Sequence, residues 1–158
     1  MKKQKGFSLI ELLIVVAIIL IIAAIAIPNL LRSRMAANES SAVGSLRTIN
    51  TAEVTYATAY PTEGFAAALV NLGGPAPCGP ATIATACLID EVLSATATKS
   101  GYTFTAPGVA PIPRVAYTVT AVPVIVGSSG QRAFFTDQSG VIRYDLTGAG
   151  ATAASPAL

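Results

Sequence analysis

An apolar run of 21 residues, from Phe7 to Ile27, constrains this chain more than any other feature of its sequence. As an α-helix such a run is about 30 Å long, which matches the hydrocarbon thickness of a bilayer. The run therefore predicts a membrane-spanning helix. A cleavable secretory signal is the alternative, because the stretch from Ala23 to Ala26 has the small residues of a signal-peptidase site, although such signals usually have a shorter apolar region.

Glu11 is the only charged residue in this run. A carboxylate at membrane depth is costly, so it usually serves a function. Glu11 is either an incidental polar residue that reaches the headgroups or the partner of a cation. The second interpretation is favoured.

Three lysines, Lys2, Lys3 and Lys5, precede the run and predict a cytoplasmic N-terminus, with the rest of the chain on the far side of the membrane. Without residues 1–6 the chain has seven basic and eight acidic side chains. No basic stripe remains that would indicate a nucleic acid as the main partner.

Helical periodicity resumes after Pro28 and ends before Pro61. We predict one helix over residues 7–59, with a transmembrane half over 7–28 and an amphipathic half over 29–60. Pro28 should weaken or kink it, because proline removes one backbone hydrogen bond. The apolar face recurs every three or four residues, at Ala42, Leu46, Ile49, Ala52, Tyr56 and Tyr60. The polar surface is expected at Arg32, Arg34, Asn38, Glu39, Arg47 and Thr48.

Residues 61–158 form the predicted C-terminal globular region. A short helix is expected around residues 89–95. After it the apolar period changes to two, which predicts antiparallel strands around residues 102–104, 117–121, 133–136 and 141–144, with a hairpin between the last two. The tail Thr147–Leu158 is expected to be poorly ordered. The predicted fold class is α+β, in which the long N-terminal helix packs on a small C-terminal antiparallel β-sheet.

The two cysteines, Cys78 and Cys87, have eight residues between them. A disulfide is the expected state if this region is exported. Metal ligation is less favoured, because two cysteines in a chain without histidine cannot complete a usual zinc site. The absence of histidine and the scattered acidic residues also leave no visible catalytic constellation. We therefore predict a protein that is not an enzyme, with no metal and no cofactor.

The segment from Gly6 to Pro28, GFSLIELLIVVAIILIIAAIAIP, closely resembles the N-terminus of type IV pilins and of the pseudopilins of type II secretion systems. The resemblance implies that a prepilin peptidase cuts after Gly6, removes residues 1–6 and methylates the new amino group of Phe7. It also implies a precursor held by inner-membrane lipids and an assembly platform that stacks subunits into an extracellular helical filament. The six-residue leader and Phe7 resemble the type IVa class.

The resemblance also suggests roles for two residues within the helix. The new amine of Phe7 would lie at lipid depth, where Glu11 of a neighbouring subunit could pair with it and fix the axial register. Pairing within one subunit is the alternative. The helix around Pro28 would become extended during assembly.

The favoured function is the major subunit of a type IV pilus. The alternatives are a major pseudopilin, a minor pilin, and a membrane-anchored enzyme or binding protein. Asp137 and Asp145 offer only weak evidence for the calcium site of major pseudopilins, because they are not clustered in one acidic loop.

Overall fold

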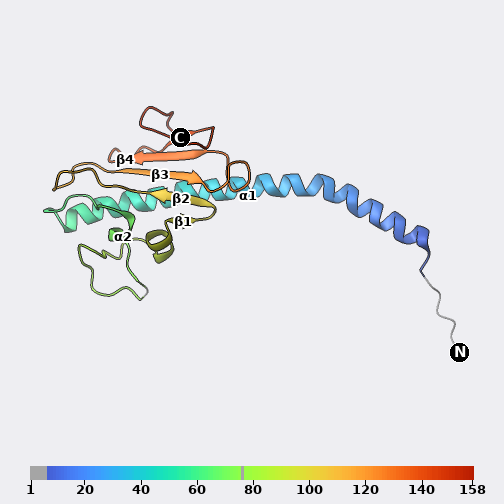
Figure 1. Ribbon diagram of the computed structural model, residues 1–158, viewed down its shortest axis with the longest axis horizontal. Helices are drawn as coiled ribbons and strands as arrows, with labels where there is room; N and C mark the ends of the chain where they lie inside the picture. The colour runs from blue at the N-terminus through green and yellow to red at the C-terminus, as the bar shows by residue number, and fades with distance from the viewer. Residues whose placement is uncertain (1–6, 76) are drawn as a thin grey trace. The chain divides into compact units, whose positions relative to one another are not determined.

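The structure is a computed structural model that describes residues 7–75 and 77–158. It contains a long helix α1 (Leu9–Ala59), a one-turn helix α2 (Leu69–Leu72), a short π-helical segment η1 (Val92–Thr96) and five strands (Figure 1). The chain divides into two compact units, residues 1–34 and residues 35–158, which we describe separately. We call the second unit the head. Gly6 and the predicted leader lie outside the described residues.

The long helix begins and ends close to the predicted positions. The carbonyl of Ser8 accepts the N–H groups of Glu11 and Leu12, at 3.1 and 3.2 Å, and so starts the first turn. α1 continues without a break through Pro28, so the predicted weakening does not end the helix. Pro61 cannot continue the helical hydrogen-bond pattern, and α1 ends just before it.

The head contains a single antiparallel sheet whose strands are neighbours in chain order. The strands are β1 (Thr98–Lys99), β2 (Tyr102–Thr105), β3 (Thr118–Pro123), β4 (Ala133–Asp137) and β5 (Arg143–Asp145). A continuous row runs across the sheet, with Phe104 opposite Ala121, Ala121 opposite Phe134 and Phe134 opposite Tyr144. β2 alternates buried aromatic residues with exposed threonines, as its sequence predicts.

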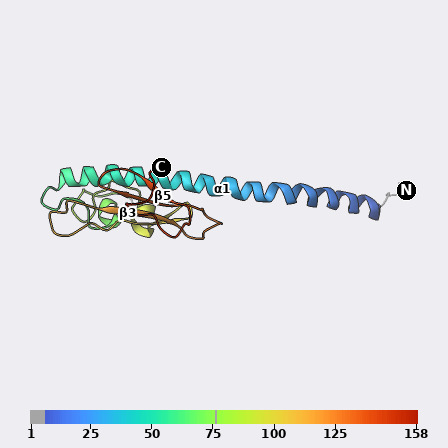
Figure 2. The same cartoon turned by 90° about the horizontal axis from the view of Figure 1, so that it is seen from above.

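The C-terminal part of α1 and the sheet form two layers, which Figure 2 shows from above. The predicted apolar stripe supplies one side of the core, and Tyr102, Phe104, Tyr117, Val119 and Phe134 supply much of the other. Hydrogen bonds tie the layers together, because Tyr117 Oη donates to Asn50 Oδ1 at 3.1 Å and Asn50 Nδ2 donates to Thr136 Oγ1 at 3.0 Å. The predicted fold class is confirmed.

Three local predictions need correction. The last predicted strand begins two residues late, at Arg143, and the expected helix around residues 89–95 is the π-helical segment at 92–96. The tail, expected to be poorly ordered, pairs with the sheet, because Ala157 forms an antiparallel bridge with Arg143. The N–H of Leu158 also donates to the carbonyl of Ile142 at 2.8 Å. Backbone groups on the outer edge of β5 thus find partners in the tail, which composition alone does not reveal.

Candidate functional site

Residues 7–31 of the first unit present an almost continuous apolar surface. Phe7 is 79% exposed, and the large aliphatic side chains from Leu9 to Leu31 are all about half exposed or more. α1 is the one helix among the described residues that is long and apolar enough to cross a membrane, by length and composition. An apolar surface of this extent requires lipid or another protein surface to cover it.

Glu11 lies within this surface, in the first turn of α1. Its side chain is exposed. The partial positive charge at a helix N-terminus favours an acidic residue in this position. Within residues 7–75 and 77–158, no hydrogen bond or ion pair involves the Glu11 carboxylate. Glu11 and Phe7 thus lie near one end of the apolar segment, and both side chains are exposed.

Glu39 differs from its predicted place on the polar surface, because it is buried at 8% exposure. Its Oε1 accepts hydrogen bonds from the backbone N–H groups of Gln131 and Arg132, at 2.9 and 3.1 Å. Its Oε2 accepts a hydrogen bond from the Nε–H of Arg132 at 2.8 Å. Burial alone would raise the pKa of Glu39, but the hydrogen bonds from Gln131 and the hydrogen bonds and charge of Arg132 together lower it. The hydrogen bonds of Glu39 thus link α1 to the residues just before β4.

Glu53 is fully buried in the head, and sequence reasoning did not single it out. Its Oε2 accepts the N–H of Ala66 at 2.8 Å, whereas Oε1 has no hydrogen-bond partner among the described residues. Burial raises the pKa of Glu53 to about 7, although the Ala66 N–H and the charge of Arg114 oppose the shift.

The spacing along α1 is the signal that could have identified both acids. Glu39 precedes Ala42 by three residues, and Glu53 follows Ile49 by four, so both lie on the apolar stripe. A search for apolar residues alone passes over them. Their burial follows from helix geometry rather than from residue type.

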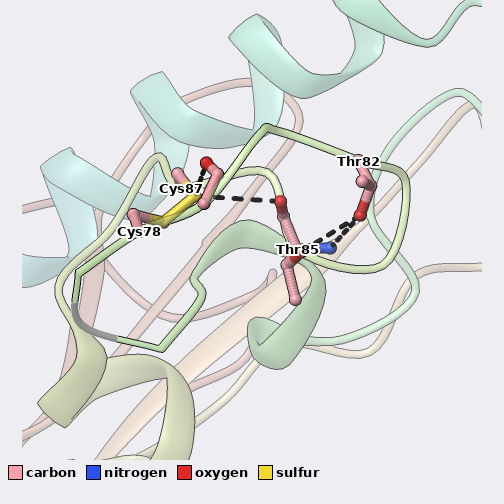
Figure 3. The surroundings of a disulfide bond; sticks show 5 residues. Cys78, Thr82, Thr85 and Cys87 are labelled. Carbon is pink, nitrogen blue, oxygen red and sulfur yellow. Dashed lines mark hydrogen bonds between the residues drawn. A yellow bond between two sulfur atoms is a disulfide. The ribbon is translucent and has the colours of Figure 1, made fainter.

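Cys78 and Cys87 form a disulfide in the loop between α2 and η1, as Figure 3 shows. Their Cα atoms are 6.0 Å apart. The same loop is held by Thr82 and Thr85, whose backbone N–H and carbonyl groups bond reciprocally at 2.9 and 3.2 Å. The bond from Cys87 N–H to the Gly73 carbonyl, at 3.1 Å, joins this loop to the residues that follow α2.

Asp137 and Asp145 each accept hydrogen bonds in a turn of their own. Asp137 accepts the N–H of Ser139 at 2.9 Å, and Asp145 accepts the N–H of Thr147 at 3.0 Å. The part of the chain that the structure describes contains no group of three or more side chains suited to a metal ion. The geometry gives the calcium interpretation no support.

Comparison with known proteins finds one family model and two relatives that match part of this chain. Residues 1–27 match the family model of the prokaryotic N-terminal methylation motif. Over 40 residues, a quarter of this chain, the sequence is 62% identical to the type IV wide pilus major component PilA4 of Thermus thermophilus. Over 54 residues, 34% of this chain, it is 46% identical to the type IV major pilin protein PilA of Myxococcus xanthus.

These matches cover only part of each protein. The chain spans 30% of the length of the Thermus relative and 24% of the Myxococcus relative. No solved structure matches the chain. The resemblance found in the sequence is confirmed by the motif and by both relatives.

Proposed function

We propose that this chain is a type IV pilin and the major structural subunit of a type IV pilus. The methylation motif and both relatives support this proposal. The observation that carries the proposal is the exposed apolar surface of residues 7–27, interrupted by the single charge of Glu11. Such a surface suits lipid before assembly and the same segment of other copies afterwards. The head has a core of its own and needs no help from this segment.

In this proposal the precursor is first inserted in the inner membrane, with its N-terminus in the cytoplasm. A prepilin peptidase cuts after Gly6 and methylates the amino group of Phe7, and the motif match over residues 1–27 supports both steps. Glycine suits the position before the cut, because a residue without Cβ lets an extended backbone enter a protease cleft. An inner-membrane assembly platform then transfers mature subunits from lipid into an extracellular filament.

Glu11 sets the register of that filament in our proposal. The cut creates a cationic amine at Phe7, four residues before Glu11. Two parallel helices can bring the carboxylate of one beside the amine of the other when they are shifted by about 6 Å along their axes. Attraction between the two charges grows as the effective dielectric falls, so the apolar bundle favours this pair over an unpaired carboxylate.

Pro28 provides the proposed point of extension. Its missing N–H leaves the carbonyl of Ala24 without the usual helical donor. The helix costs less to unwind here than elsewhere along the apolar segment, which would let tightly packed subunits lengthen during assembly.

Shearing the producing cells tests the proposed function. We expect long extracellular fibres that contain this chain, and mass spectrometry should show subunits that begin at a methylated Phe7. Subunits confined to a short structure within the cell envelope would instead identify a pseudopilin. Mature subunits from a variant in which Gly6 is replaced by a bulky residue would contradict the proposed cleavage.

Glu11→Ala tests the register role. The precursor should still be cut and inserted, but the yield of filaments should fall on the order of tenfold or more, because an unpaired buried amine costs several kcal/mol. Glu91→Ala, which removes an exposed carboxylate from the head, is the matched control and should assemble normally. Normal filaments from Glu11→Ala would contradict the register role.

A further inference from the structure

Two loops of the head expose clusters of apolar side chains. We call residues 109–115 the proline loop, where Val109, Ile112 and Val115 are 45, 57 and 78% exposed. We call residues 124–126 the valine turn, where Val124, Ile125 and Val126 are 55, 61 and 47% exposed. Loop tips are usually polar, and a run of exposed apolar residues in one calls for a function.

The two loops lie at opposite ends of the head. The proline loop precedes β3 and the valine turn follows it (Figure 1). The N–H of Phe65 donates to the carbonyl of Arg114 at 3.0 Å, so the proline loop lies near the Ala59 end of α1. At the other end, Asn38 Nδ2 donates to the carbonyl of Ser129 at 2.8 Å, which holds the valine turn near Met35.

Both loops are held in place by backbone hydrogen bonds. In the proline loop, the N–H of Arg114 donates to the carbonyl of Glu63 at 2.8 Å, and the N–H of Val109 donates to the carbonyl of Ala116 at 3.0 Å. In the valine turn, the N–H of Ser129 donates to the carbonyl of Ile125 at 2.9 Å. Ordered loops lose little conformational entropy on binding, so their apolar surface is available for association.

We propose that the proline loop of one copy packs against the valine turn of another copy, so that heads stack end to end. This inference rests on the proposed filament and names a contact within it. The occupant is a second copy of the chain, because each cluster presents three exposed aliphatic side chains and the two clusters lie at opposite ends of the head. A contact between two different patches is heterologous, and when its rotation does not close it produces an open helical fibre. A two-fold dimer formed end to end would pair identical loops and leave the other cluster in water.

The stacking contact and the Glu11 contact join different pairs of copies. For segments that run along the fibre, pairing of Glu11 with Phe7 sets an axial shift of about 6 Å. The head contains 25 residues of α1, from 35 to 59, and is therefore at least about 37 Å long along this part of the helix, so two stacked heads are displaced by at least that distance. One neighbour cannot satisfy both shifts, so the N-terminal segments link near neighbours and the heads link copies further along the fibre.

Cysteine cross-linking in sheared filaments tests the contact. The variant Ile112→Cys with Ile125→Cys is treated with a short bismaleimide, which reacts with free thiols and leaves the Cys78–Cys87 disulfide intact. We expect a ladder of multimers, and the mixed assembly of the two single variants should give dimers only. Ile112→Cys with Val92→Cys is the matched control, because Val92 is 53% exposed but belongs to neither loop. It should give no ladder.

Filaments that assemble, react at both thiols and show no ladder would overturn the stacking contact while leaving the proposed function intact. A ladder from the control pair as strong as that from the loop pair would also overturn it. A second pair, Val115→Cys with Val124→Cys, is read in the same way in case the first pair disturbs assembly. Failure of the unaltered chain to form any fibre would contradict the proposed function, and the stacking contact with it.

Discussion

Two acids on one stripe of α1 have opposite electrostatic environments. Glu39 receives three hydrogen bonds, two of them from backbone N–H groups, and its pKa is lowered. Glu53 receives one hydrogen bond, and burial raises its pKa to about 7. Glu39 therefore stabilises the head as a carboxylate, whereas the charged form of Glu53 destabilises it. Burial raises the pKa of both acids, but only at Glu39 do three hydrogen bonds and the charge of Arg132 outweigh it.

At the residue scale, the raised pKa of Glu53 predicts that the head loses stability as the pH rises. Below pH 4.5, the ordinary pKa of the group, Glu53 is protonated in the folded and unfolded chain. Between pH 4.5 and about 7 only the folded chain keeps the proton, so stability falls with rising pH, by about 3 kcal/mol over this interval. Glu53→Gln, which cannot ionise, should remove this slope in thermal unfolding of the detergent-solubilised chain.

Glu91→Gln serves as the control for this experiment, because it removes an exposed carboxylate of the same head. It should keep the slope of the unaltered chain between pH 4.5 and 7. A Glu53→Gln variant with the same slope as the unaltered chain would show that Glu53 is ionised throughout this range when folded.

At the scale of elements, α1 combines two chemically different halves in one helix. Residues up to Leu31 expose their apolar side chains, whereas residues from Glu39 to Tyr56 bury one stripe against the sheet. Pro28 lies in this exposed half, and its own side chain is exposed. We therefore expect the local stability of α1 to be lowest around this residue.

Pro28→Ala should restore the missing hydrogen bond and stabilise this part of α1 by up to about 3 kcal/mol. Amide exchange around residues 25–31, measured on the detergent-solubilised chain, should slow on the order of a hundredfold. Asn29→Ala changes a neighbouring side chain without adding a backbone donor and should leave exchange nearly unchanged. Equal exchange in Pro28→Ala and the unaltered chain would argue against a weak point at Pro28.

The disulfide loop is the second element with a measurable contribution. Replacing Cys78 and Cys87 together by serine should lower the free energy of unfolding of the head by roughly 2–3 kcal/mol, because the bond restricts a loop of about nine residues in the unfolded chain. Thermal unfolding with and without a reductant measures this cost. Ala81→Ser, an exposed change in the same loop, is the control. An unchanged unfolding temperature in the double variant would show that the loop is held by its backbone hydrogen bonds alone.

At the scale of the whole molecule, the sequence predicts what depends on local patterns. The helix bounds, the apolar stripe on α1 and the strands β2, β3 and β4 follow from apolar periods of 3.6 and two, whereas the two-residue strand β1 is too short to show a period. Partners far apart in the chain could not be predicted. Glu39 binds Arg132, which is 93 residues away, and no local pattern links them. The prediction of a poorly ordered tail is wrong for the same reason. The tail pairs with the edge of β5, and the sequence does not show that this edge lies beside it.

The candidate assembly residues were identified from a different kind of signal. Gly6, Phe7 and Glu11 were singled out because a carboxylate in an apolar run needs a reason and because the segment resembles a known family. The two loops proposed to stack the heads carry no such signal. Their residues read as ordinary apolar stretches, and only the structure shows that these side chains are exposed at opposite ends of the head.

Direct imaging of sheared filaments at near-atomic resolution tests the central claim, the pairing of Glu11 across subunits. We predict that the Glu11 carboxylate of each copy lies within about 4 Å of the Phe7 amine of a neighbouring copy, inside a bundle of apolar helices. A Glu11 carboxylate that contacts only solvent, or only the amine of its own chain, would contradict the account.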